Sequence, residues 1–357
     1  MRYIIFGAGA IGGVVGARLF EQGIEVVLVA RGEHLRVIQR AGLTLQSPER
    51  SVTLPIPARS HPTELAFRPS DDVVLLATKT QDSTLALAEL RNATAAAIPV
   101  VCLQNGAEAA RLALRRFDRV AGAITMLPNA HLQPGIVQAH STPVPGIVDV
   151  GRYPSGDDPL LATVSADLRR AGFDSEVRLD IVRWQYGKLL ENLKNALQAL
   201  CGPDGDYADL VSGLRTKAEA CYRAAGIATV PEHELRGRSR GVLNLGMIDG
   251  RTRPGDSSWQ SLVRATGSIE SDFLFVSGGD VGVRKEEQLR ALVEQGVAGP
   301  GAALIGDRAI DVAAARATGL RSIAVLWGHG SRAELEGAEP DLLLEVPAEL
   351  KGLAGAI

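Results

Sequence analysis

The chain has 357 residues, a net charge of −3 and a hydrophobic fraction of 46%, the composition of an ordinary globular protein of about two or three domains. Basic residues are scattered and aromatic residues make up only 4%, so no nucleic-acid partner is predicted. No apolar run reaches the ~18 residues that a membrane-spanning helix requires, so no membrane span is expected.

The start of the sequence and its cysteines predict a cytoplasmic protein. The first apolar run begins directly after Met1, which leaves no room for a secretory signal peptide. The cysteines are widely spaced, and we expect buried, reduced thiols at Cys102, Cys201 and Cys221. The six histidines form no cluster with metal-ligand spacing, and no metal site is predicted.

Four apolar runs in the first part of the chain each end in a short polar motif. The runs predict buried parallel strands at residues 3–6, 25–29, 72–76 and 98–103. Their endings are the glycine-rich segment 7–12, Arg31, Lys79 and Asn105-Gly106. Because open parallel sheets bind ligands at the carboxyl ends of their strands, we expect one crevice to collect all four endings. The pattern therefore predicts an α/β domain of the Rossmann type with a doubly wound parallel sheet.

The glycine-rich segment predicts a dinucleotide-binding turn. Gly7 permits a tight turn after the first strand, Gly9 lets the backbone approach a pyrophosphate, and Gly12 lets the following helix pack against the sheet. That helix, residues 11–21, points its N-terminal N–H groups at the phosphates. The predicted cofactor-binding residues of this turn are Gly7, Ala8, Gly9, Ala10, Ile11 and Gly12.

The end of the second run indicates which nicotinamide cofactor is used. An NAD site usually has Asp or Glu there to hold the ribose 2′-hydroxyl, whereas this chain has Arg31. A guanidinium is suited to a phosphate, which favours NADP. Glu33 follows two residues later and leaves NAD open as the alternative.

The third and fourth runs end in residues with two interpretations each. Lys79 either contacts the cofactor or the substrate, or is an ordinary solvated lysine. Asn105 belongs to an Asn-Gly pair, which can be merely a turn. Because this amide follows a fully apolar run, we favour a position near the nicotinamide for Asn105.

After Asp180 the apolar pattern changes to a helical period. The segment 181–200 is predicted to form one helix with Lys188, Asn192 and Asn195 on one face. Buried polar groups without partners are costly, so a substrate with carbonyl, hydroxyl and carboxylate groups is expected there. The alternative is a lysine that reaches solvent beside two structural amides.

Together these motifs resemble the ketopantoate reductase family over residues 1–274. The resemblance rests on the glycine turn, on Ala30-Arg31-Gly32, on Leu103-Gln104-Asn105-Gly106, on Lys188 with Asn192, and on the segment 258–273. It implies NADPH-dependent reduction of 2-dehydropantoate to pantoate, with another small 2-oxo acid as the alternative substrate. The helical segment could pair with a second copy, so a homodimer is possible, although nothing in the sequence demands it.

The resemblance also implies roles for individual residues. Lys188 would be the catalytic acid and Glu270 its carboxylate partner, with Arg31 on the 2′-phosphate and Lys79 near the cofactor. The family commonly has an asparagine eight residues after the lysine, but here Ala196 holds that position and Asn195 precedes it. The expected substrate-binding residues are Asn105, Lys188, Asn192, Asn195, Ser258 and Glu270.

The last part of the chain resembles the C-terminal half of a haloacid dehalogenase-superfamily phosphatase. The resemblance rests on Lys285, on the segments 305–311 and 325–330, and on residues 341–347. In that superfamily the aspartates help to hold Mg²⁺ and the lysine steadies a phosphorylated aspartate. The nucleophilic Asp-x-Asp motif is missing, since its nearest counterpart, Asp149-Val150-Gly151, has glycine in the second position. We expect a fused segment without phosphatase activity, and a magnesium-dependent phosphatase is the alternative.

These observations predict three domains. Residues 1–178 form the NADP-binding domain, 179–274 an all-helical substrate domain, and 275–357 the haloacid dehalogenase-like fragment.

Overall fold

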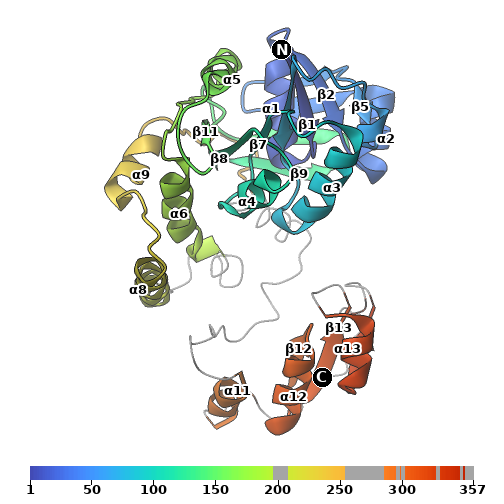
Figure 1. Ribbon diagram of the computed structural model, residues 1–357, viewed down its shortest axis with the longest axis vertical. Helices are drawn as coiled ribbons and strands as arrows, with labels where there is room; N and C mark the ends of the chain where they lie inside the picture. Colours follow the sequence, from blue (N-terminus) through green and yellow to red (C-terminus); the bar gives the residue numbers. More distant parts are fainter. Residues whose placement is uncertain are drawn as a thin grey trace. The chain divides into compact units, whose positions relative to one another are not determined.

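The computed structural model describes residues 1–195, 208–253, 285–294, 298, 302–326, 330–345 and 349. The chain divides into two compact units, Met1–Asp272 (unit 1) and Phe273–Ile357 (unit 2) (Figure 1). The further division of unit 1 at residue 178 stays a prediction. Across the described ranges, no helix has the length and apolar character needed to cross a membrane.

A seven-stranded sheet in the order β11-β8-β7-β6-β1-β2-β5 lies at the centre of unit 1. Each strand is parallel to its neighbours, except that β11 is antiparallel to β8. The sheet confirms the predicted Rossmann-type architecture. Its strands are β1 (Arg2–Phe6), β2 (Glu25–Val29), β5 (Ala58–Arg59), β6 (Asp72–Leu76), β7 (Val100–Cys102), β8 (Val120–Met126) and β11 (Ile147–Arg152).

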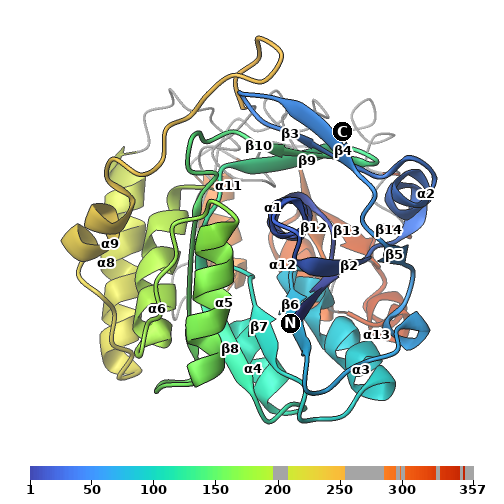
Figure 2. The same cartoon turned by 90° about the horizontal axis from the view of Figure 1, so that it is seen from above.

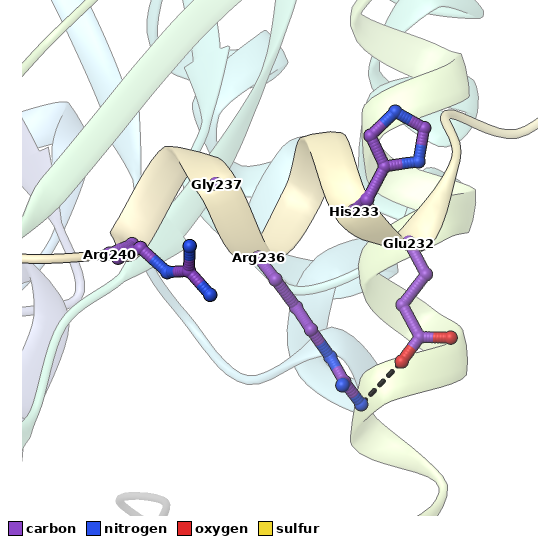
Figure 3. A pocket seen from close by; sticks show the side chains of 5 residues that line it. All are labelled: Glu232, His233, Arg236, Gly237 and Arg240. Atoms are coloured by element: carbon purple, nitrogen blue, oxygen red, sulfur yellow. Dashed lines mark ion pairs between the residues drawn. The ribbon is translucent and has the colours of Figure 1, made fainter.

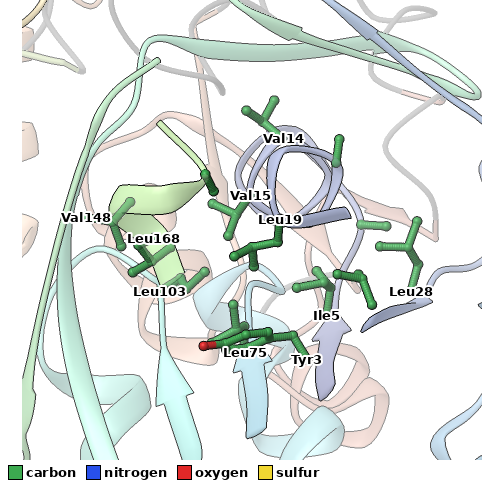
Figure 4. Close-up of a cluster of buried hydrophobic side chains, with 14 of the residues drawn as sticks. Tyr3, Ile5, Val14, Val15, Leu19, Leu28, Leu75, Leu103, Val148 and Leu168 are labelled. Carbon is green, nitrogen blue, oxygen red and sulfur yellow. The ribbon is translucent and has the colours of Figure 1, made fainter. Parts of the chain in front are cut away.

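Helices cover both faces of this sheet, which explains why its central strands are apolar throughout. Tyr3 and Ile5 of β1 pack under α1 (Ala10–Glu21) and α5 (Pro159–Arg170), and Figure 4 shows this core. Ile4 and Phe6 pack on the opposite face with α3 (Ser83–Ala93) and α4 (Glu108–Leu114) (Figure 2). Successive side chains of β1 thus point to opposite faces of the sheet and pack into two separate cores.

A second, four-stranded sheet in the order β4-β3-β10-β9 was not indicated by the apolar runs. Its strands are short, and Val137 of β10 joins the core that covers α1. The strands are β3 (Leu43–Gln46), β4 (Ser51–Leu54), β9 (Asn129–Gln133) and β10 (Ile136–Ala139). Around the main sheet lie α2 (Gly32–Ala41) and two 3₁₀ turns, η1 (Pro62–Glu64) and η2 (Thr80–Asp82).

The described part of unit 1 after β11 and α5 is helical, as predicted. It contains α6 (Ile181–Asn192), α8 (Ala208–Ala224) and α9 (Glu232–Ser239). The predicted helix over 181–200 is interrupted, because α6 ends at Asn192 and Leu193 is a turn; residues 194–195 are helical again, and 196–200 lie outside the described residues. The Leu193 N–H reaches back only three residues to the Leu190 carbonyl, which tightens the helix end.

The expectation of three buried thiols holds for one cysteine and is wrong for another. Cys102 is buried in β7, and burial raises the pKa of its thiol to about 12. Cys221 is exposed, because α8 has no buried residue within the described structure. Cys201 lies outside the described residues.

A buried ion cluster joins α9 to the sheet. Asp149 of β11 is fully buried, and its carboxylate accepts hydrogen bonds from Arg178 Nε at 2.9 Å and Arg238 Nη2 at 2.7 Å. Arg238, on α9, also donates to Asp174 at 2.9 Å. The Arg178 guanidinium lies 4.0 Å above the Trp184 ring of α6. Asp149 is therefore a buried structural anion, so this nearest counterpart of a phosphatase nucleophile is unavailable for attack.

Unit 2 contains a small parallel sheet in the order β12-β13-β14, which confirms the predicted α/β character of the tail. The strands are β12 (Ala303–Gly306), β13 (Arg321–Val325) and β14 (Leu342–Leu344). The helices are α11 (Lys285–Glu294), α12 (Ala309–Ala317) and α13 (Arg332–Gly337). Val312, Ala324 and Leu335 form a core between α12, β13 and α13.

Candidate active site

The carboxyl ends of four parallel strands lie in register, as the sequence predicts. Phe6 of β1 is aligned with Val29 of β2 on one side and Leu76 of β6 on the other. Leu76 is aligned in turn with Cys102 of β7. The polar segments that follow these strands therefore emerge at one edge of the sheet.

The glycine turn is closely packed at Gly7 and Gly12 and open at Gly9. Gly7 has φ +107°, and a Cβ there would stand 2.7 Å from the Thr78 nitrogen. A Cβ on Gly12 would stand 2.1 Å from the Gly7 carbonyl oxygen, so only glycine lets α1 pack this closely. No described atom lies within 4 Å of a Cβ added to Gly9. The first turn of α1 also has no side-chain cap within the described structure, which leaves its N–H groups available to an anion.

Arg31 stands where the sequence placed it, directly after β2 at the N-cap of α2. Its guanidinium pairs with the Glu89 carboxylate of α3 at 2.6 Å. Glu33, the predicted alternative ligand for a ribose, instead pairs with Arg36 at 2.9 Å on the exposed side of α2. Glu89 was missed by the sequence analysis, because no local pattern connects two residues on separate helices.

The predicted acid meets an amide from the fourth strand end. Lys188 Nζ, on α6, donates a hydrogen bond to Asn105 Oδ1 at 2.6 Å. Desolvation by burial lowers the pKa of the Lys188 ammonium to about 8. Gly106 has φ +81°, and a Cβ added there would lie 3.5 Å from Leu189 Cδ2 of α6, so the Asn-Gly turn lies beside this helix. The structure thus brings Lys188 and Asn105 together although they are far apart in sequence.

The remaining predicted site residues are placed less fully. Asn192 lies on α6 one turn after Lys188, whereas Asn195 follows the end of that helix. Lys79 is exposed and precedes η2 at the end of β6. Ser258 and Glu270 lie outside the described residues, so the Lys188–Glu270 pair stays a prediction.

Two buried polar groups at the strand ends were missed by the sequence analysis. Thr78 Oγ1 and Gln104 Oε1 have no hydrogen-bond partner among the described residues. Gln104 is buried, and its Nε2 is 3.4 Å from Ser83 Oγ. Both residues directly precede predicted site residues, and this position at a strand end was the signal that could have found them. Because such groups normally have partners, they are suited to receive donors from a bound ligand.

Comparison with known proteins identifies the family. The sequence profile of ketopantoate reductase PanE/ApbA matches residues 3–155. The 2-dehydropantoate 2-reductase of Mesorhizobium japonicum is 32% identical over 241 residues, covering 62% of this chain and 72% of that protein. The chain belongs to the ketopantoate reductase family.

Further comparisons define how far this membership extends. The chain spans 61% of the length of the first curated relatives, and that of Pyrococcus horikoshii is 30% identical over 54% of this chain. A PanE/ApbA-family ketopantoate reductase from Ralstonia eutropha shares the fold with a TM-score of 0.58 and 25% identity, over 67% of this chain and 80% of that one. D-mandelate dehydrogenase, solved with NADH, has the same fold at 20% identity and a TM-score of 0.59, over 68% of this chain and 80% of that one. This reductase fold therefore occurs in proteins named for different 2-hydroxy acids.

The tail matches a different family model from the reductase part. A HAD-hydrolase-like profile matches residues 284–350. A phosphoglycolate phosphatase of Synechococcus elongatus is 30% identical over 204 aligned residues, covering 55% of this chain and 81% of that protein. The ketopantoate reductase region is thus followed by a HAD-hydrolase-like segment, as the sequence predicts.

The described residues of the tail do not fit a Mg²⁺ site. Asp311 is buried, and one carboxylate oxygen pairs with Lys285. The other oxygen accepts hydrogen bonds from the backbone N–H groups of Asp307 at 3.0 Å and Arg308 at 3.1 Å. Asp311 is therefore the capping-box residue in the first turn of α12, and Arg308 is the N-cap. Within the described ranges, no three His, Cys, Asp or Glu residues gather closely enough to hold a metal.

A cavity of about 440 Å³ on α9 is separate from the reductase site. Figure 3 shows its lining by Glu232, His233, Arg236, Gly237 and Arg240. Arg236 is paired with Glu232 in the same helix, so one of the positive charges that line the cavity is already neutralised. The cavity contains none of the residues predicted for catalysis, and the strand ends remain the candidate active site.

Proposed function

We propose that this ketopantoate reductase family member is an oxidoreductase that reduces 2-dehydropantoate to pantoate with NADPH. The observation that carries the proposal is the contact between Lys188 and Asn105 at the edge of the sheet from which the glycine turn also emerges. An ammonium with a pKa near neutrality, beside a dinucleotide crevice, is suited to the reduction of a ketone. Arg31 supports NADPH as the cofactor, since its guanidinium is suited to the 2′-phosphate.

Bound NADPH would supply a hydride to the ketone carbon. Negative charge then develops on the carbonyl oxygen, and the Lys188 ammonium stabilises this charge and gives the oxygen a proton. Asn105 Oδ1 orients the Lys188 Nζ by accepting one of its hydrogens. The N-terminal N–H groups of α1 hold the pyrophosphate near Gly9. Glu270 would favour the charged form of Lys188, opposing the desolvation that lowers its pKa.

The pKa of Lys188 predicts a specific pH dependence. Ketone reduction needs the protonated ammonium, so kcat/KM for reduction should be constant at low pH and fall as pH rises through about 8. The reverse oxidation of pantoate needs the neutral amine as base, so its rate should rise over the same range. Initial rates in both directions across pH give the test. Parallel profiles for the two directions would contradict the assignment of Lys188.

Oxidation of NADPH with a panel of 2-oxo acids tests the proposed substrate. We expect the highest kcat/KM with 2-dehydropantoate. The second candidate is the 2-oxo acid that corresponds to D-mandelate, which the shared fold of D-mandelate dehydrogenase favours. Turnover of that acid alone would move the substrate assignment to the second candidate. Absence of turnover with every 2-oxo acid would contradict the proposal.

A phosphate-release assay with Mg²⁺ distinguishes the phosphatase alternative. We expect no hydrolysis of phosphoglycolate, because Asp311 is engaged by Lys285 and by the backbone of α12. Phosphate release that disappears in Asp307→Ala would support a phosphatase. Nucleotide binding without turnover of any substrate would support a catalytically inactive fusion protein.

A further inference from the structure

The end of the crevice that distinguishes NADPH from NADH contains a carboxylate as well as an arginine. Glu89 Oε2 lies 2.6 Å from Arg31 Nη2. The Glu89 side chain is 20% exposed, whereas Arg31 is 57% exposed. The carboxylate is therefore the more buried member of the pair, and the guanidinium is the more exposed one.

The surrounding elements fix Glu89 at this end of the sheet. Val29, the last residue of β2, is paired with Arg59 of β5, which brings the following segment beside Arg31. In that segment, His61 Nδ1 accepts the Thr63 N–H at 3.2 Å. This leaves the Nε2 face of the imidazole toward Glu89, 3.8 Å from the same Oε2. Both neighbours of this carboxylate oxygen thus come from residues that follow strands β2 and β5.

A 2′-phosphate and a 2′-hydroxyl meet this arrangement differently. A ribose 2′-hydroxyl can donate a hydrogen bond to a carboxylate, as in sites that bind NAD. A 2′-phosphate carries negative charge and is repelled by a nearby carboxylate. Glu89 already engages Nη2 of Arg31 and so competes with the phosphate for this guanidinium, and the pair has no net charge to attract that ligand.

We propose that Glu89 is a specificity-determining residue that reduces the preference of the site for NADPH over NADH. This inference rests on the proposed function, because it assumes that the adenosine ribose lies beside Arg31. Arg31 supplies the binding energy for the 2′-phosphate, and Glu89 competes with the phosphate for the same guanidinium. Removal of the negative charge from Glu89 frees Arg31 and should raise the selectivity of the site for NADPH.

Equilibrium binding of NADPH and NADH to the full chain, followed by the fluorescence of the reduced nicotinamide, tests this inference. Glu89→Gln keeps the shape of the side chain and removes its charge. We expect this variant to bind NADPH about tenfold more tightly and NADH within about threefold of the unsubstituted protein. Competition by adenosine 2′,5′-bisphosphate should strengthen in parallel, whereas competition by AMP should not, which localises the effect at the 2′ position.

Glu25→Gln is the matched control. Glu25 begins β2, the strand that ends before Arg31, and so lies at the other end of that strand. Its carboxylate pairs with Arg68 at 2.6 Å. Glu25→Gln makes the same change of charge as Glu89→Gln. Both nucleotides should bind to the Glu25→Gln variant as they do to the unsubstituted protein.

The outcomes separate the two proposals. If the unsubstituted protein binds NADPH and Glu89→Gln binds it equally tightly, the role of Glu89 is overturned. The same holds if the variant binds both nucleotides more tightly by the same factor. The reductase function stands in both cases. Failure of the unsubstituted chain to bind either nucleotide would overturn both.

Discussion

Replacement of Lys188 by alanine is expected to lower kcat for 2-oxo acid reduction by roughly 10³-fold, because the developing oxyanion loses its proton donor. NADPH affinity should stay within a few-fold of normal, since Lys188 contacts Asn105 after β7, and β6 separates β7 from β1 and its glycine turn. Single-turnover kinetics and nucleotide titration measure the two effects separately. A loss of this size with intact NADPH binding is what a catalytic acid predicts.

Two further variants sharpen this test. Lys188→Arg keeps the positive charge but cannot release a proton at neutral pH, so it should restore little of the rate. Lys194→Ala removes an exposed lysine of the following segment and should leave the rate unchanged. Near-normal turnover by Lys188→Ala would show that another group supplies the proton.

Replacement of Asp149 by alanine is expected to destabilise unit 1 by about 3 kcal/mol, since it leaves two arginines beside the sheet without their shared anion. Asp149 is 0% exposed, and its partners Arg178 and Arg238 are 17% and 7% exposed. Loss of one member of a buried ion cluster is costly because the remaining charges stay desolvated. Thermal unfolding followed by circular dichroism should show a midpoint lowered by roughly 10 °C.

An exposed ion pair supplies the comparison for Asp149. Asp180 pairs with Arg183 at 2.9 Å, and both side chains are more than two-fifths exposed. Asp180→Ala should cost less than about 1 kcal/mol, because solvent screens such pairs. If the two alanine variants unfolded at the same temperature, the ion cluster around Asp149 would have no special role in stability.

The parts of the fold that follow local rules could be predicted from the sequence. The glycine turn was predictable because each glycine has its own steric reason, and Gly7 and Gly12 indeed leave no room for a Cβ. The four strand ends were predictable because continuous apolar runs form buried parallel strands, whose ends face one edge of the sheet. The sheet β4-β3-β10-β9 escaped prediction because its short strands lack such runs.

Contacts between distant segments were beyond local rules. Lys188 was predicted as a site residue, but its distance to Asn105 depends on how α6 packs against β8. The Arg31–Glu89 pair and the Asp149–Arg238 pair join residues on separate elements, and neither leaves a periodic signal in the sequence. The end of α6 at Asn192 was missed because the apolar pattern continues through Leu193.

Arg238 fastens α9 to the outer strand of the nucleotide-binding sheet through two carboxylates, Asp149 and Asp174. A swinging motion of α9 away from this strand would have to separate these charges in a dry environment, at a cost that thermal fluctuation rarely meets. Admission and release of small molecules should therefore leave this corner of the protein stationary.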